Sequence, residues 1–92
     1  MADDTVRRRV TVHGDVQGVF FRDTARRKAT DAGVSGWIAN RSDGTVEAVF
    51  EGPPEAVEQV VDFCREGPSA ATVERADVSE EEPEGLSGFD VR

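Results

Sequence analysis

"TVRRRVTVHGDVQGVFFRDTARRKATDAG", residues 5–33, contains the two periodicities that decide the fold. Val6, Val10 and Val12 fall on one face of an extended chain, and this period of two predicts a strand. Further along, four side chains at helical spacing predict a helix that stops at Gly33: Phe21, Ala25, Ala29 and Ala32. The stretch is therefore a strand, a glycine-containing loop and a helix.

The rest of the chain continues this pattern. Two short strands are expected in residues 35–52 around the turn Ser42-Asp43-Gly44, because Asp-Gly favours a hairpin. Residues 53–67 predict a second helix, with Pro54 in its first turn and four side chains on one face: Val57, Val60, Val61 and Cys64. Residues 71–81 and 86–91 are two further strand candidates.

The predicted order is β-α-β-β-α-β with an extra terminal strand. It favours an α+β, ferredoxin-like split βαβ sandwich, in which a four- to five-stranded antiparallel sheet carries two helices on one face. Ninety-two residues suit one small domain, residues 1–92. This scaffold hosts many activities, so the fold alone does not indicate a function.

The composition is strongly acidic. Nineteen acidic residues against eleven basic ones give a net charge of −8, and Lys28 is the only lysine. Two explanations remain open: codon usage that favours arginine, or adaptation to high salt, where dense carboxylates keep a surface hydrated. Either way, the surface would repel nucleic acid and anionic membranes. No apolar run is long enough to span a bilayer, and we expect a cytoplasmic protein.

No pattern predicts a metal or another cofactor. Cys64 is the only cysteine, and the arginine that a cysteine phosphatase needs six positions on is replaced by Ala70. We expect Cys64 to lie in the core. Residues 80–84 are expected to form a solvated acidic run without metal-ligand spacing. His13 ends the first strand and is expected to be partly exposed, with a structural role.

The aromatic side chains divide between core and surface. Trp37 and Phe50 lie on predicted strands, and we expect both in the core rather than in a ligand site. Phe21 fits the apolar face of the first helix, whereas Phe20 is placed to line the mouth of a pocket.

The connecting loop, "GDVQGVFFR" in residues 14–22, is the candidate site. Gly14 and Gly18 permit positive φ or close approach of the backbone to a ligand. Free N–H groups in such a turn, together with the helix dipole, can bind an anion, and Arg22 adds a planar fork suited to phosphate or carboxylate. It is not a nucleotide P-loop, because the spacing differs. From spacing alone, a tight strand-to-helix connection with an exposed arginine is an equally good interpretation.

Two motifs together extend this interpretation. "VHGDVQGVFFR", residues 12–22, followed by "GWIANRSDGTVEAVFEG", residues 36–52, closely resembles the acylphosphatase family. The likeness extends over essentially the whole chain. It implies the ferredoxin-like fold and hydrolysis of the carboxyl–phosphate bond of acyl phosphates, without a metal or a covalent intermediate.

The resemblance also implies roles for individual residues. Arg22 would bind phosphate as a catalytic residue, and Asn40, in the second motif, would orient the attacking water. The phosphate would lie in a cradle formed by the loop before Arg22: Asp15, Val16, Gln17, Gly18, Val19, Phe20 and Phe21. Such a sparse site is chemically sufficient, because a carboxylate leaving group with a pKa of about 4 needs no general acid.

Alternatives remain. A non-enzymatic ferredoxin-like module would require aromatic side chains and a basic face for RNA, which the first strand lacks, or paired cysteines for a metal. An acylphosphatase-like domain of a carbamoyl-phosphate-using maturation enzyme is the third possibility. We expect a monomer that acts on a small-molecule substrate.

Overall fold

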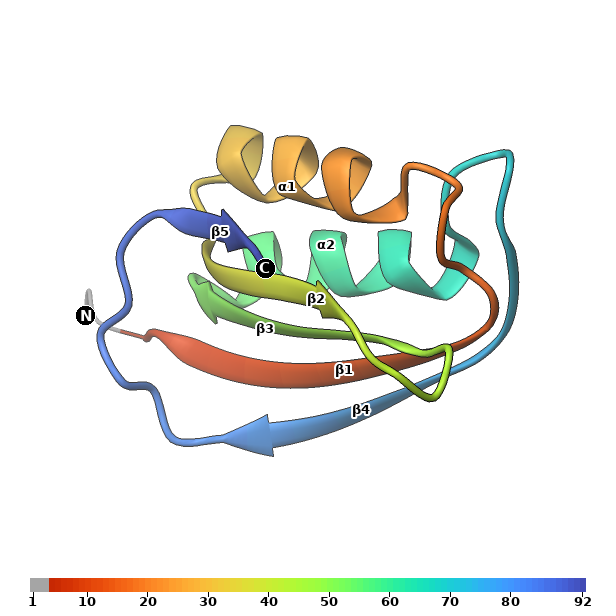
Figure 1. Ribbon diagram of the computed structural model, residues 1–92. Coiled ribbons are helices and arrows are strands. Elements are labelled where there is room, and N and C mark those ends of the chain that lie inside the picture. The colour runs from red at the N-terminus through yellow and green to blue at the C-terminus, as the bar shows by residue number, and fades with distance from the viewer. Residues whose placement is uncertain (1–3) are drawn as a thin grey trace.

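The computed structural model describes residues 4–92, so residues 1–3 of the predicted domain lie outside the described residues. A single β-sheet carries two antiparallel-packed helices on one of its faces, as Figure 1 shows. The elements follow the predicted order, with these bounds: β1 Val6–Asp15, α1 Phe21–Ala32, β2 Ser35–Asn40, β3 Val46–Gly52, α2 Pro54–Glu66, β4 Thr72–Glu81 and β5 Phe89–Val91. The α+β, ferredoxin-like prediction is confirmed.

The strand order in the sheet is β4-β1-β3-β2-β5. The pairs β1–β4, β1–β3 and β2–β3 are antiparallel, as predicted. The short β5 differs, because it pairs in parallel with β2, with Val91 opposite Ile38. Periodicity identifies a strand but not its neighbour, and this parallel pair makes the sheet mixed rather than wholly antiparallel.

The core fills the space between the sheet and the helices. Alternate residues of β1, Val10 and Val12, are fully buried there, and so is Phe50 of β3. The predicted apolar faces of both helices are buried too: Phe21, Ala25 and Ala29 of α1, and Val57, Val60, Val61 and Cys64 of α2. Each helix ends at the expected glycine, Gly33 for α1 and Gly67 for α2.

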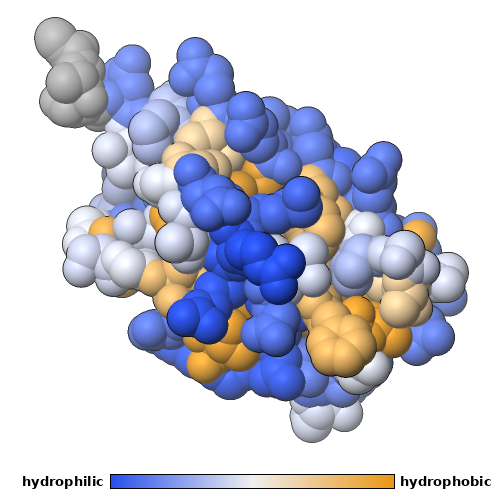
Figure 2. Space-filling view, turned by 90° about the horizontal axis from the view of Figure 1, so that it is seen from above, coloured by the Kyte–Doolittle hydropathy of each residue, from blue (hydrophilic) through white to orange (hydrophobic). Residues whose placement is uncertain are grey.

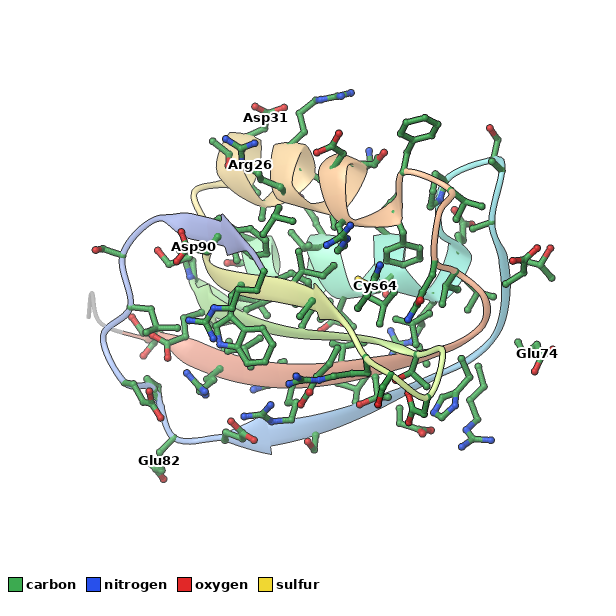
Figure 3. The ribbon with its side chains drawn as sticks, in the orientation of Figure 1. Arg26, Asp31, Cys64, Glu74, Glu82 and Asp90 are labelled. Carbon is green, nitrogen blue, oxygen red and sulfur yellow. The ribbon has the colours of Figure 1, made fainter. Side chains whose placement is uncertain are left out.

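Cys64 lies inside this core, between the sheet and the helices (Figure 3). Burial raises the pKa of its thiol to about 12, so the thiolate that a nucleophile requires is not formed at neutral pH. The prediction that Cys64 is a core residue is confirmed. None of the helices in residues 4–92 is long and apolar enough to cross a membrane.

The opposite face of the sheet carries no helix and is covered by charged side chains. Arg7 of β1 is buried there and contacts Glu51 of β3 at 2.7 Å and Glu81 of β4 at 2.8 Å. The prediction of a solvated run in residues 80–84 is therefore wrong for Glu81, which also pairs with Arg9 at 2.6 Å. Opposite charges on neighbouring strands face one another and form a network that sequence periodicity did not reveal.

Trp37 also lies on this open face rather than in the core. It is half-buried, and the guanidinium groups of three arginines lie over its ring at 4.7–5.7 Å: Arg9, Arg41 and Arg92. The core prediction for Trp37 is wrong, because alternation along β2 places Ile38, and not Trp37, against the helices.

Candidate active site

The topology brings three strand ends to one edge of the sheet. Strands β1 and β2 are both antiparallel to β3, so their C-terminal ends point the same way, and β5 runs parallel to β2. In Figure 1 the arrows of β2 and β5 point to the right, toward the side on which β1 ends. The loop of residues 16–20 leaves β1 there, Asn40 ends β2, and Val91 ends β5. Segments from both motifs thus meet at one place.

A cavity of about 190 Å³ lies at this edge. Its lining includes six of the predicted site residues, from the loop, from the start of α1 and from the end of β2: Val16, Gly18, Phe20, Phe21, Arg22 and Asn40. The remaining members of the predicted cradle, Asp15, Gln17 and Val19, are not among the lining residues.

These three residues have other surroundings. Asp15 is the exposed last residue of β1, and Val19 packs against the hydrophobic core. The side-chain amide of Gln17 donates to the main-chain oxygens of Arg41, at 2.7 Å, and Thr45, at 2.9 Å. Both acceptors belong to the connection that follows Asn40, so Gln17 ties the loop to the segment that carries Asn40.

The first turn of α1 faces the cavity without a side-chain cap. The N-cap residue is Phe20, whose side chain makes no capping hydrogen bond. Within residues 4–92, the main-chain N–H groups of residues 17–22 donate to no main-chain carbonyl. Unpaired N–H groups at the positive end of a helix dipole form an anion site, so this arrangement suits a phosphoryl group.

The two glycines of the loop serve different purposes. Gly18, with φ of 74°, borders the cavity and has no atom near the position of a Cβ. Gly14, with φ of 130°, lies where β1 shifts register against β4, and a Cβ there would collide with the main-chain oxygen of Thr72. Gly14 is therefore required by strand packing rather than by a ligand, and only Gly18 fits the predicted ligand role.

Arg22 is the second residue of α1 and lines the cavity. Its Nη1 donates to the main-chain oxygen of Arg92 at 3.0 Å, and within residues 4–92 no Asp or Glu side chain forms an ion pair with it. A cation at the positive end of a helix dipole is unfavourable. A bound anion would remove this cost, so the position of Arg22 itself indicates an anion ligand.

Two lining residues were missed in the sequence. Asp23 follows Arg22 in the first turn of α1, where an acidic residue is common and gives no separate signal. Val91 reaches the cavity only because β5 pairs in parallel with β2. No local pattern could have placed Val91 in the same cavity as Asn40.

The other candidates lie away from the cavity. His13 is half-exposed, and its Nε2 lies 3.0 Å from Asp77 of the neighbouring strand β4. Asp43 accepts hydrogen bonds from the main chain and the hydroxyl of Thr45, as expected for a turn residue. In residues 4–92, no three His, Cys, Asp or Glu side chains are grouped so that they could hold a metal ion.

Comparison with known proteins gives a consistent match. A family model described as Acylphosphatase matches residues 8–91. A curated acylphosphatase of Gloeobacter violaceus is 56% identical over 86 residues, covering 94% of this chain and 92% of the relative. An acylphosphatase of Haloarcula marismortui is 54% identical over 86 residues, covering 94% of each.

A solved structure agrees with these sequence matches. An acylphosphatase from Coxiella burnetii is similar with a TM-score of 0.93 and 37% sequence identity, covering 100% of both chains. The similarity therefore includes the loop, both helices and all five strands.

Proposed function

We infer that this chain, which belongs to the acylphosphatase family, hydrolyses the carboxyl–phosphate bond of acyl phosphates to a carboxylate and inorganic phosphate. The observation that carries this conclusion is the cavity where the uncapped start of α1, Arg22 and Asn40 meet. The relatives are acylphosphatases over nearly their whole length, so a non-enzymatic module and a domain of a maturation enzyme are not favoured.

The phosphoryl group is held by the loop and by Arg22. Main-chain N–H groups of residues 17–22 donate to its oxygens, and the guanidinium of Arg22 adds a bidentate contact. Negative charge develops on these oxygens during the reaction, and fixed donors stabilise it without reorganisation. Gln17 keeps the loop in place through its two hydrogen bonds to the segment after Asn40.

Asn40 positions the attacking water. Its side-chain oxygen accepts a hydrogen bond from the water and holds the water oxygen in line with phosphorus. The water oxygen forms a bond to phosphorus while the bond from phosphorus to the acyl oxygen breaks. The acyl group leaves as a carboxylate, and the water protons pass to phosphate oxygens and solvent. Since the carboxylate is a good leaving group, no acid has to protonate it.

The domain organisation, oligomeric state, location and cofactor requirement of the enzyme are also proposals. We expect residues 1–92 to form one domain that acts as a monomer in the cytoplasm and needs no metal or other cofactor. The net charge of −8 and the similarity to an acylphosphatase of Haloarcula marismortui support adaptation to high salt.

A hydrolysis assay tests this function. The protein should release phosphate from a synthetic acyl phosphate, equally with and without a chelator. Inorganic phosphate should inhibit competitively, because the same donors would bind the product. Loss of activity on adding the chelator would overturn the metal-free mechanism. Inactivity toward several acyl phosphates, with phosphate still bound, would favour the binding-module alternative.

A further inference from the structure

Exposed apolar side chains gather at the cavity. Only two large hydrophobic residues within residues 4–92 are exposed, Phe20 at 76% and Val91 at 39%. Both of them line the cavity that also contains Arg22 and Asn40. Seen from above in Figure 2, the outer face of the molecule over α1 is largely hydrophilic, with hydrophobic residues in separate patches. Two exposed apolar side chains at one small site therefore need an explanation.

The fold does not explain Phe20. Its ring lies outside the hydrophobic core and its side chain caps nothing. The backbone is in the left-handed region, with φ of 64° and ψ of 21°, which is unfavourable for residues with a Cβ and suits glycine. Glycine or asparagine would fit this N-cap position with less strain. Phe20 is thus costly both in backbone conformation and in exposed apolar area.

Val91 reaches the same place from the other end of the chain. Pairing of β5 with β2 sets Val91 beside Ile38, two residues before Asn40. Its neighbour Arg92 is fixed by a hydrogen bond from its N–H to the oxygen of Ile38 at 2.8 Å, and its own oxygen accepts from Arg22. The position of Val91 at the cavity is therefore held from both sides.

The cavity is too small for a whole ligand. Its volume of about 190 Å³ is below the roughly 300–1,000 Å³ of typical small-molecule pockets. A phosphoryl group bound at the N–H groups of α1 fills the polar part, and the acyl group must project past the lining residues. Phe20 and Val91 are the exposed apolar side chains of the lining, since Val16 and Phe21 are buried, while Asp23 disfavours an acyl group that carries a negative charge.

We propose that Phe20 and Val91 form an acyl subsite, which makes the enzyme prefer acyl phosphates with an aromatic or branched apolar acyl group over small or anionic ones. This proposal rests on the proposed function, since it assigns the other half of the same substrate. The acyl group covers the exposed ring of Phe20. The removal of both apolar surfaces from water and the contact with the ring stabilise the bound substrate.

Steady-state kinetics with benzoyl phosphate and acetyl phosphate tests the subsite. The unsubstituted protein should show the higher kcat/KM for benzoyl phosphate. In Phe20→Gly, which suits the left-handed backbone, the ratio of the two kcat/KM values should fall by about tenfold, the value of one aromatic contact. Phe20→Leu should restore part of the ratio, and Val91→Ser should lower it by about threefold.

Leu86→Ser is the matched control. Leu86 is a half-buried residue before β5, at the opposite edge of the sheet, so its loss should leave the ratio unchanged. If the unsubstituted protein hydrolyses neither substrate, the proposed function fails. If it hydrolyses both but Phe20→Gly lowers the two kcat/KM values equally, or neither, the acyl subsite is wrong and the proposed function stands.

Discussion

Arginines on the open face of the sheet and the arginine at the cavity have opposite surroundings. Arg7 and Arg9 each contact two carboxylates at hydrogen-bond distance, and Arg7 is almost fully buried between Glu51 and Glu81. Arg22 contacts only a main-chain oxygen and stands at the positive end of α1. Carboxylates of the protein thus neutralise the arginines of the open face, whereas the arginine at the cavity is available to a ligand.

This difference separates stability from function. On the open face, Glu47, Glu51 and Glu81 each have a guanidinium partner from the neighbouring strand β1, so changes there should alter the free energy of unfolding. The cavity has unpaired N–H groups and, within residues 4–92, an arginine without an Asp or Glu partner, and both favour the binding of an anion. Changes in the cavity should therefore alter catalysis with little effect on the free energy of unfolding.

Replacement of Arg22 tests this separation with the largest expected effect. Arg22→Ala removes the charged fork, so phosphate affinity and turnover should both fall, and kcat/KM by at least about 10³-fold. Arg22→Lys should remain poor, because an ammonium cannot reproduce the planar bidentate contact. Arg26→Ala is the control, since Arg26, one turn further along α1 (Figure 3), is exposed and does not line the cavity. Equal losses in both alanine variants would contradict a special role for Arg22.

Replacement of Asn40 should lower turnover without the loss of phosphate affinity expected for Arg22→Ala. Asn40→Ala leaves the loop and Arg22 in place but removes the group that holds the water, so kcat should fall by about 10²–10³-fold. The inhibition constant for inorganic phosphate should stay within about threefold of the original. Turnover close to normal in Asn40→Ala would show that another group positions the water.

On the open face, Glu51→Gln should change stability instead. Burial by itself would raise the pKa of the Glu51 carboxyl, but N–H groups of residues 84–86 and the Arg7 guanidinium outweigh it and lower the pKa. Because all of these partners donate, an amide cannot replace the carboxylate, and we expect a loss of about 2–3 kcal/mol. Urea unfolding measures it.

Glu84→Gln provides the comparison for Glu51. Glu84 lies 3.8 Å from Arg7 and its side chain is 66% exposed, so its loss should cost less than about 0.5 kcal/mol. Activity per folded molecule should be unaffected in both variants. If the Glu51→Gln protein is as stable as the original, the charge of Glu51 adds nothing to the free energy of unfolding that an amide does not also supply.

Acid should weaken the same network. Hydrogen bonds from Arg9 and Arg7 lower the pKa of Glu81 to about 2. A lowered carboxyl pKa contributes stability above the unfolded pKa of about 4.3, and this contribution is lost as pH falls toward 2. Melting temperatures should therefore decline between pH 4.5 and 2 by more in the original protein than in Glu81→Gln. Parallel declines would contradict this role of Glu81.

The fold was largely predictable because residues close together in the sequence determine each helix and strand. The apolar positions of α1 and α2 and the glycines that end them are separated by a few residues, and all were correct. The parallel pairing of β5 was not predictable, because nothing within residues 86–91 specifies its neighbour. Arg7 and Glu51 are 44 residues apart, so their burial depends on strand register rather than on either sequence neighbourhood.

The candidate site likewise has features that the sequence predicted and features that only the assembled fold shows. Spacing in residues 14–22 indicated an anion-binding loop, and the family resemblance added Asn40, which the topology brings to the same cavity. Val91 could not be found, because only the assembled sheet places it there. The side-chain hydrogen bonds of Gln17 and the close packing of Gly14 could not be predicted, since their partners lie in the β2–β3 connection and in β4.

Salt should produce the smallest effect, and its sign distinguishes the two explanations of the acidic composition. The ion pairs of the open face join atoms 2.6–2.8 Å apart, which is shorter than the Debye length of about 3 Å at 1 M salt. Repulsion among scattered carboxylates such as Glu74 and Glu82, which project outward in Figure 3, acts over longer distances and is screened more strongly. Molar potassium chloride should therefore raise the melting temperature, by about 5 °C. The variant Glu74→Gln/Glu82→Gln should melt higher at low salt and respond less to added salt. A melting temperature that is flat or falls between low and molar salt would favour codon usage as the origin of the composition.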